Sequence, residues 1–451
     1  MGAFHAYDIR GVYNVDFDRE TAYKVGYFIP ELLGTDKVLV GRDCRVSSDE
    51  IHDYLIRGIA DAGADVYDLG LATTPMVYFG TAEYGFKASV QITASHNPAQ
   101  YNGMKVSREN ALPVGLDNGL GQIRDWIDAG RPCPAAGKKG QVHAMDIHKA
   151  YLDFLLKFRQ DWSSLKIAMD VSNGMACLYV KEIFGDAPSY IYDTMDGRFP
   201  NHEPNPLVPE NVAALKELVL RTGADVGVIY DGDADRVMFV DENGRFISPD
   251  LMIAVLGHWF LEEKGEKGIV LQDIRSSKAV GEYLRPMGAE METWKVGRAF
   301  AARKLREIDG VYGGELAGHY YFRDFFYSDS GLLASILILN VIAGMKSKGI
   351  SLSGLISRIE KYQNSGEINF RIGDKRGAMD AVRDYFMGSE KATAYMDFDG
   401  YRVEFPDWWF NIRPSNTEPY LRFICEASSR ELLDSKVSAV RRILSEKFGA
   451  E

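Results

Sequence analysis

Short apolar runs alternate with amphipathic segments through the first three quarters of the chain, and this alternation restricts the fold more than any other feature. The apolar runs have the length of single strands, and the segments between them have the spacing of helices. The strand candidates are Lys37–Val40, Ala88–Ile92, Lys166–Val171, Asp225–Tyr230, Gly268–Leu271 and Tyr320–Phe322, with helices expected at, for example, Asn211–Leu220 and Ser276–Leu284. Strands that alternate with helices predict α/β units with largely parallel strands.

The C-terminal part of the chain follows a different pattern. Extended segments are expected at Glu367–Ile372, Tyr401–Phe405 and Tyr420–Glu426, with helices at Gly377–Met387 and Arg430–Phe448. Gly- and Pro-bearing stretches that could be seams between domains are Gly130–Gly140, the neighbourhood of Ser248-Pro249, and Asn364–Gly366. A chain of 451 residues exceeds what one hydrophobic core usually serves. We therefore expect several α/β domains followed by an α+β domain.

A short repeat is consistent with a multiplied α/β unit. It comprises Gly63-Ala64-Asp65-Val66, Gly223-Ala224-Asp225-Val226 and Gly288-Ala289-Glu290-Met291. Each copy follows a helical pattern and leads into an extended segment, and glycine suits the left-handed position that ends a helix. A match this short can also arise by chance, so the sequence leaves both duplication and coincidence open.

Charge and composition narrow the classes of function. The net charge of −12 argues against nucleic acid or an anionic membrane as a partner. The cysteines (Cys44, Cys133, Cys177, Cys425) lack metal-ligand spacing and are typical of reduced thiols in a cytoplasmic protein. No secretory signal is visible. The most apolar stretch, Gly331–Met345, is shorter than the ~20 residues of a membrane span, so we expect a buried helix.

The segment Thr93–Pro98 (TASHNP) directly follows the apolar strand Ala88–Ile92. A hydroxyl at the carboxyl end of a strand lies where open α/β sheets usually bind ligands, which makes Ser95 a candidate nucleophile. The alternative is a polar turn with a helix N-cap. The missing flanking glycines of GxSxG argue against a hydrolase nucleophile elbow.

The segment Asp231–Arg236 (DGDADR) lies between two apolar runs. Three carboxylates separated by small residues can converge on one hard cation such as Mg²⁺. An EF-hand calcium loop is the tempting alternative, but Arg236 stands where that pattern requires glycine, and the flanking segments are strands. A metal site therefore explains this loop better than an acidic turn does.

Two later loops carry further polar groups. Gly313–His319 (GGELAGH) places Glu315, which can accept hydrogen bonds from sugar hydroxyls, near His319, which could transfer protons. A glycine-rich turn with a satisfied histidine is the alternative. Arg413–Pro419 (RPSNTEP), with Arg422 shortly after, combines guanidinium, hydroxyl and amide donors that suit a phosphate dianion. Here the alternative is a turn with incidental arginines.

Taken together, these loops and Tyr7–Gly11 (YDIRG) occur in the order found in α-D-phosphohexomutases, and the chain resembles that superfamily from residue 7 to residue 422. The opening AYDIRG looks more like the phosphomannomutase/phosphoglucomutase enzymes than the phosphoglucosamine mutases. The resemblance implies three consecutive α/β mixed-sheet domains of similar topology plus a C-terminal α+β cap, heart-shaped around a central cleft. The expected bounds are 1–148, 149–249, 250–365 and 366–451.

The resemblance also implies an activity: interconversion of hexose 1-phosphate and hexose 6-phosphate, with mannose or glucose as the hexose. Ser95 would carry the phosphoryl group, and a hexose 1,6-bisphosphate would be the intermediate and activator. One Mg²⁺ would be bound by Asp231, Asp233, Asp235 and Ser95, with Arg236 behind them. The expected partners are small hexose phosphates, without nucleic acid or membrane, and the enzyme would be a monomer or homodimer.

The resemblance assigns the remaining site residues to three groups. Arg10, His96, Lys105 and His319 would assist catalysis beside Ser95. Further contacts to the substrate would come from Glu315, Ala317, Lys295, Arg298 and Arg275. The non-reacting phosphate would be bound by Arg413, Ser415, Asn416, Thr417 and Arg422.

Two positions depart from the pattern of the family. Ala317 stands where relatives closest to phosphomannomutase often have Ser, and Arg298 stands where many have His. Because a guanidinium cannot act as a general base near neutral pH, we expect Arg298 to bind phosphate or sugar oxygen. That leaves His319 and Lys105 as proton-transfer candidates. The alternative functions are a phosphoglucosamine mutase, a metal-dependent phosphatase and a non-catalytic sugar-phosphate binder.

Overall fold

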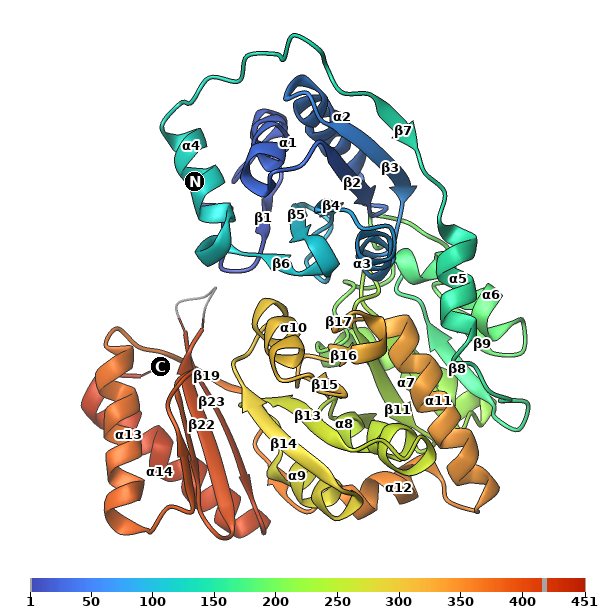
Figure 1. The fold of residues 1–451 in the computed structure, drawn as a ribbon. Coiled ribbons are helices and arrows are strands. Elements are labelled where there is room, and N and C mark those ends of the chain that lie inside the picture. The colour runs from blue at the N-terminus through green and yellow to red at the C-terminus, as the bar shows by residue number, and fades with distance from the viewer. Residues whose placement is uncertain (1, 416–419, 451) are drawn as a thin grey trace.

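Four units follow one another along the chain, each built on its own sheet (Figure 1). The computed structural model describes residues 2–415 and 420–450. The first sheet has the order β1 (Ile9–Val12), β5 (Tyr101–Arg108), β4 (Ala88–Ile92), β2 (Lys37–Arg42), β3 (Asp65–Leu71), β7 (Val142–Ala144), with β6 (Pro113–Val114) beside β5. Its helices are α1 (Arg19–Leu33), α2 (Ser48–Asp61), α3 (Thr74–Glu83) and α4 (Leu120–Asp128).

The second and third units have smaller sheets. The second has the order β12 (Phe246–Ile247), β11 (Val237–Asp241), β10 (Val226–Tyr230), β8 (Ile167–Asp170), β9 (Ser189–Ile191), with helices α5 (His148–Leu156), α6 (Val180–Phe184) and α7 (Ala213–Thr222). The third has the order β14 (Ala289–Trp294), β13 (Gly268–Asp273), β15 (Tyr312–Gly314), β16 (Tyr320–Phe322), β17 (Ser328–Asp329). Its helices are α8 (Leu251–Gly257), α9 (Lys278–Leu284), α10 (Arg298–Glu307), α11 (Gly331–Ser347) and α12 (Leu352–Ile359).

The three sheets share one topology. Numbering four strands of each unit in chain order, the spatial order is 2-1-3-4: β3-β2-β4-β5, then β9-β8-β10-β11, then β14-β13-β15-β16. In each of these three units the first three of the four numbered strands are parallel and the fourth is antiparallel to the third. The repeated glycines at 63, 223 and 288 all have positive φ and precede the second or third strand of a unit. The three glycines therefore do not occupy equivalent positions, and the shared strand order, not this short repeat, supports a multiplied α/β unit.

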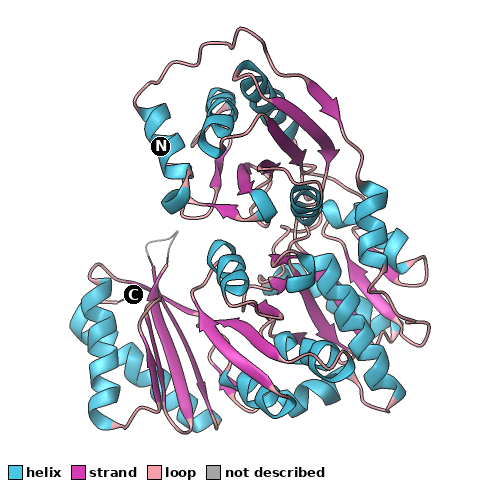
Figure 2. Cartoon of the chain, in the orientation of Figure 1, coloured by secondary structure: helices cyan, strands magenta, loops and turns pink. Residues whose placement is uncertain are grey.

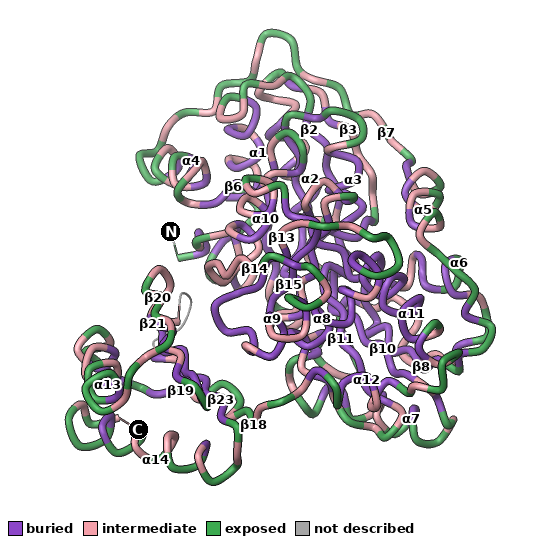
Figure 3. Tube along the Cα trace, turned by 60° about the horizontal axis from the view of Figure 1, so that its bottom comes forward, coloured by how far each residue is buried: buried purple, intermediate pink, exposed green. Residues whose placement is uncertain are grey.

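The C-terminal unit, called the cap below, is entirely antiparallel. Its order is β18 (Gln363–Asn364), β23 (Tyr420–Ala427), β22 (Trp408–Pro414), β21 (Tyr401–Glu404), β20 (Ala394–Met396), and β19 (Ile368–Arg371) also pairs with β23. Helices α13 (Lys375–Ser389) and α14 (Arg430–Phe448) lie on one side of this sheet (Figure 2). The cap has its own hydrophobic core, whereas one continuous core joins the second and third units to part of the first, including α3; buried residues are purple in Figure 3.

Most of the expected elements are confirmed, with ends shifted by a few residues. Helix α7 begins later than expected because a 3₁₀ turn, Pro209–Val212, precedes it. The stretch 130–140 does not separate two sheets, since β7 after it pairs with β3 of the first sheet. Glycine and proline there interrupt regular structure, but they do not determine which sheet the next strand joins.

Helix α11 confirms the buried apolar helix expected near its position. Among the described residues no single helix is long and apolar enough to cross a membrane; only α11 and α12 together pass that test, as a pair bent by 101°.

Candidate active site

Equivalent loops of the three repeats carry the chemistry. The loop between the third and fourth strands holds Ser95 in the first unit, Asp231–Asp235 in the second, and Glu315 with His319 in the third. These loops meet at one cleft of about 800 Å³, to which the cap adds Arg413, Ser415 and Arg422. The repeated topology therefore brings together motifs that are far apart in the sequence.

Ser95 lines this cleft and faces the loop Asp231–Asp235. Its side-chain hydroxyl donates to Oδ2 of Asp231 over 2.9 Å, and the residue is 3% exposed. Its φ of +51° is a left-handed conformation that costs a non-glycine residue about 1–3 kcal/mol. The Thr93 hydroxyl accepts the Ser95 N–H at 2.9 Å. A Cβ on Gly232 would lie 2.5 Å from the Ser95 carbonyl oxygen, so glycine is what lets the two loops approach.

The three aspartates are fully buried and converge. One carboxylate oxygen from each of Asp231, Asp233 and Asp235 lies within 4.8 Å of the others. The Lys105 ammonium, on β5, lies 2.6 Å from Oδ2 of both Asp233 and Asp235. The Arg236 guanidinium donates through Nε to Asp231 over 2.9 Å. Two cations therefore partly neutralise three buried anions.

The donor set fits a divalent cation. Oδ1 of Asp233 and Oδ1 of Asp235 are buried and have no hydrogen-bond partner within 2–415 and 420–450. Burial, together with Asp235 and Asp233, raises the pKa of Asp231 to about 7. Both observations describe a carboxylate cluster with too little positive charge, and carboxylate oxygens are the ligands that Mg²⁺ prefers.

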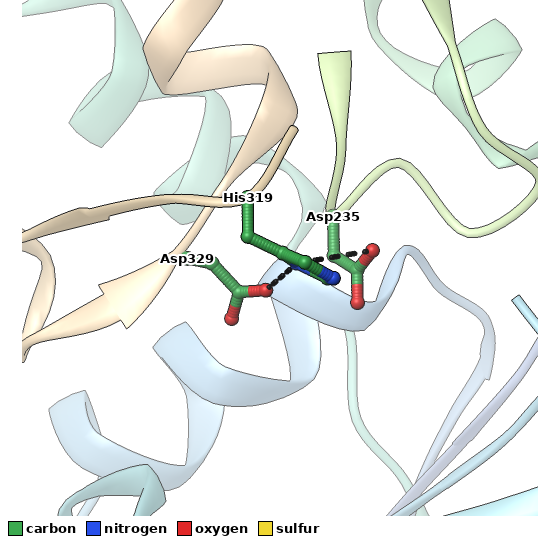
Figure 4. Close-up of side chains that lie close together, drawn as sticks. All are labelled: Asp235, His319 and Asp329. Carbon is green, nitrogen blue, oxygen red and sulfur yellow. Dashed lines mark hydrogen bonds and ion pairs between the residues drawn. The ribbon is translucent and has the colours of Figure 1, made fainter. Parts of the chain in front are cut away.

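His319 lies between Asp329 and Asp235 (Figure 4). Its Nδ1 is 2.6 Å from Oδ2 of Asp329 and 3.8 Å from Oδ1 of Asp235. Burial lowers the pKa of His319, but the nearby carboxylates Asp235 and Asp329 outweigh burial and raise it above the ordinary value. Because Nδ1 is engaged, Nε2 is the ring nitrogen that can address a substrate.

Arg298 lines the cleft and also contacts Asp329. Its Nε donates to Oδ1 of Asp329 over 3.0 Å, and its guanidinium lies 3.8 Å from the centre of the Tyr78 ring. Sequence reasoning missed Asp329, which is fully buried and whose only signal was a polar Ser-Asp-Ser segment ahead of the apolar helix α11. The Arg298 side chain therefore has a protein partner in addition to any substrate oxygen.

Arg10 and His96 flank Ser95. Arg10 donates to Oδ1 of Asn97 over 2.8 Å and to Asp8 over 2.5 Å. His96 has its Nδ1 3.4 Å from the Ser95 hydroxyl. Burial and the neighbouring cations Arg236 and Arg10 hold the pKa of His96 well below its ordinary value. The imidazole is therefore neutral at physiological pH.

The loop Gly313–His319 places a carboxylate on the third-unit side of the cleft. Glu315 is 2% exposed, and its Oε1 accepts from the Tyr321 hydroxyl over 2.9 Å. Burial raises the pKa of Glu315. Ala317 lines the cleft and has no hydroxyl to offer. Arg275 also lines the cleft, and its guanidinium pairs with Asp273 at 2.8 Å.

The cap contributes cations. Arg413 is 4% exposed, and neither its Nε nor its Nη1 has a hydrogen-bond partner in the described chain. Burial, and then Arg275, lower the pKa of Arg413. Arg422 lies 3.0 Å from Glu367, and Ser415 lines the cleft. The expected ligands Asn416 and Thr417 lie outside the described residues.

Lys295 differs from the other expected substrate-binding residues of the described chain. Its ammonium lies 5.5 Å from the centre of the Phe300 ring, and the cleft lining includes the next residues, Val296–Ala299, but not Lys295 itself.

The cleft is more basic than the protein as a whole. Among the described residues that line it, seven cationic side chains face four carboxylates, although the chain carries a net charge of −12. The cations are Arg10, Lys105, Arg236, Arg275, Arg298, Arg413 and Arg422. This local excess gives an anionic ligand an attractive field within an acidic protein.

This architecture defines a four-unit α/β protein with three repeats and an antiparallel cap around an anion-attracting cleft. Family models agree with it along the chain. The models for phosphoglucomutase/phosphomannomutase alpha/beta/alpha domains I, II and III match residues 1–130, 149–244 and 248–362, and the C-terminal domain model matches 367–443.

Individual proteins give the same result. The chain is 34% identical to a phosphomannomutase of Salmonella montevideo over 99% of both chains. It is 36% identical to a protein named phosphohexose mutases of Xanthomonas campestris pv. campestris, over 98% of this chain and 99% of that one. A crystal structure of a phosphoglucomutase/phosphomannomutase family protein from Burkholderia thailandensis superposes with a TM-score of 0.87 at 28% identity, covering 99% and 97% of the two chains. The chain belongs to the phosphoglucomutase/phosphomannomutase family.

Proposed function

We propose that this chain interconverts hexose 1-phosphate and hexose 6-phosphate, acting on mannose or glucose, by passing a phosphoryl group through Ser95. The observation that carries the proposal is the 2.9 Å hydrogen bond from the Ser95 hydroxyl to Asp231, within a buried triad of carboxylates. A hydroxyl set against a metal-type carboxylate cluster is what phosphoryl transfer needs, since this chemistry depends on alignment and charge neutralisation. The proposed location is cytoplasmic.

The proposed metal is one Mg²⁺, held by Asp231, Asp233, Asp235 and an oxygen on Ser95. When bound, it would supply positive charge to the phosphoryl oxygens. The chain's own cations would add to this, because Arg10 lies next to the Ser95 loop and Lys105 lies between two of the carboxylates. His319, with Nδ1 engaged by Asp329, would exchange a proton with the sugar oxygen through Nε2.

The two phosphate positions require the sugar to turn around. Phospho-Ser95 would give its group to the substrate and form a hexose 1,6-bisphosphate. That intermediate would then rotate end for end, so that its other phosphate faces Ser95. Arg413 and Arg422 would hold whichever phosphate is not reacting, and Glu315 would accept hydrogen bonds from sugar hydroxyls in either orientation. The separate core of the cap supports a unit that could loosen during this rotation.

The experiment follows hexose 1-phosphate, hexose 6-phosphate and free phosphate together by ³¹P NMR. Mannose 1-phosphate and glucose 1-phosphate are supplied separately, with Mg²⁺ and a trace of bisphosphate. We expect conversion to the 6-phosphate with little free phosphate, and intact-protein mass spectrometry should find one phosphoryl group on the enzyme. Release of phosphate as the main product would favour a phosphatase instead.

Ser95→Ala tests the residue itself. We expect turnover and protein phosphorylation to disappear while the thermal midpoint stays close to that of the unsubstituted protein, because only one hydroxyl is removed. Ser163→Ala, at an exposed position, is the control and should behave as the parent. Substantial mutase turnover by Ser95→Ala would contradict the proposal.

A further inference from the structure

A buried arginine outside the cleft holds the loop that carries Ser95. Arg45 follows β2, and its side chain is 0% exposed. The residue is not among those that line the cleft in the described chain. A charge this deeply buried is costly unless every donor is paired.

All five guanidinium N–H groups of Arg45 have acceptors. Nε donates to Oδ2 of Asp43 over 3.1 Å. The other four bonds reach backbone carbonyls of one loop: Nη2 donates to Ser95 at 2.8 Å and Asn97 at 2.6 Å, and Nη1 donates to Pro98 at 2.7 Å and Tyr101 at 3.0 Å. The planar fork thus fixes four carbonyls of the Ser95 loop at once.

The third repeat has the same kind of turn after its first strand. There too, a residue of the turn, in this case its aspartate, is hydrogen-bonded to the loop between the third and fourth strands. Asp43 accepts the backbone N–H of Arg45 at 3.0 Å, and Asp273 accepts that of Arg275 at 2.6 Å, each just after the first strand of its repeat. In the third repeat Asp273 also accepts the N–H of Leu316, in the loop Gly313–His319, at 2.8 Å. Arg275 itself lines the cleft, whereas Arg45 turns to the loop behind Ser95.

Residues of the second unit pack against Arg45 and its neighbour Cys44. The Phe199 ring centre lies 4.9 Å from the guanidinium carbon. A Cβ on Gly197 would lie 2.0 Å from the Cys44 carbonyl oxygen, so the two backbones touch. Arg45 therefore lies at the joint between the unit that carries Ser95 and the unit that carries the aspartates.

We propose that Arg45 is a positioning residue for phosphoryl transfer, which sets the Ser95 hydroxyl against the aspartate triad by clamping the backbone of residues 95–101. This inference rests on the proposed function of Ser95. Lysine keeps the charge but offers at most three N–H groups without a planar fork, so Arg45→Lys must release part of the loop. A shift of about 1 Å in a reacting group can cost on the order of 100-fold in rate.

The test compares Arg45→Lys with Arg42→Lys. Arg42 lies on the same strand and pairs with Asp49 at 2.6 Å, without contacting the Ser95 loop through a described hydrogen bond. Phosphoryl transfer from glucose 1,6-bisphosphate to the protein is followed by quenched-flow mass spectrometry. For Arg45→Lys we expect the rate constant to fall roughly 10- to 100-fold at full amplitude, with the steady-state KM for hexose phosphate within about twofold. Arg42→Lys should match the parent.

Hydrogen exchange of the peptide spanning residues 93–103 gives a readout that needs no chemistry. Exchange there should rise in Arg45→Lys and stay unchanged in Arg42→Lys. Parental exchange in Arg45→Lys, or a loss of amplitude at an unchanged rate constant, would overturn the inference. If the parent protein accepts no phosphoryl group, the proposed function fails, and the exchange comparison still decides whether Arg45 holds the loop. Should Arg45→Lys not fold, Asp43→Asn replaces it, because this change removes the carboxylate that accepts Nε of Arg45 at 3.1 Å; the same rise in exchange and fall in rate constant are expected, and parental values of both would overturn the inference.

Discussion

Replacing Lys105 by Met should make the stability of this protein depend strongly on Mg²⁺. The Lys105 ammonium lies 2.6 Å from both Asp233 and Asp235, and all three side chains are buried. Burial lowers the pKa of Lys105, but the carboxylates Asp233 and Asp235 outweigh it and hold the pKa above its ordinary value. Lys105 is therefore charged at any physiological pH.

The size of the effect follows from the local charge. Without metal, three carboxylates face Lys105 and Arg236, which leaves a net charge of about −1; the substitution makes it about −2. Removing one partner of a buried ion pair costs about 3–5 kcal/mol. That loss corresponds to a fall in thermal midpoint on the order of 10 °C. A bound divalent cation would bring the variant's cluster to about zero, so most of the loss should vanish in saturating Mg²⁺.

The assay is calorimetry at about pH 8, above the value of about 7 to which burial and the neighbouring carboxylates raise the pKa of Asp231 in the parent. The variant and its parent are compared with Mg²⁺ and with EDTA. Lys87→Met, at an exposed position, controls for loss of a lysine. An equal fall in midpoint under both conditions, or no fall in EDTA, would refute the reasoning.

Three further predictions concern the cap and the loop contact. Arg413→Ala should raise the KM for hexose phosphate about 10- to 100-fold with little change in kcat, since charge-assisted hydrogen bonds contribute roughly 1.5–3 kcal/mol; an unchanged KM would remove Arg413 from the phosphate site. Gly232→Ala should lower kcat by roughly tenfold or more, because the added Cβ would lie 2.5 Å from the Ser95 carbonyl oxygen and push the loops apart; normal kinetics would contradict that contact. Glu426 accepts hydrogen bonds from Ser277 and Trp409, and burial raises its pKa from 4.5 to about 7. Because the folded state then binds the proton more tightly than the unfolded state, the free energy of unfolding should fall as pH rises from about 4.5 to 7, and then level off. Glu426→Gln should flatten that slope in thermal midpoints measured with saturating Mg²⁺, and an unaltered slope would assign it to another group.

Local sequence determined much of the site. Asp231, Asp233 and Asp235 lie so close along the chain, between two apolar strands, that any fold with those strands brings their carboxylates together. Ser95 follows a fully buried strand, which places it at a strand end whatever the rest of the chain does. The expected strands Ala88–Ile92 and Tyr320–Phe322 were confirmed residue for residue, because their apolar runs have clear ends.

Contacts across the units could not be read from local pattern. Lys105 reaches Asp233 from 128 positions away, through an antiparallel strand that the alternation of apolar runs did not predict. Asp329 and Arg45 are charged residues in unremarkable segments, and only their buried partners distinguish them. The extra strand β7 joined the first sheet for a similar reason, since pairing depends on a neighbour that is distant in sequence.

The sequence by itself determined which residue types stand at the ends of which strands, because burial and periodicity act over a few residues at a time. Only the tertiary structure decided that the third-to-fourth strand loops of three repeats face one cleft. It also decided that Lys105, Asp329 and Arg45 pair with residues of those loops. The physical reason is that charge neutralisation and hydrogen bonding depend on distance in space, and one chain can bring the same two residues together or keep them apart.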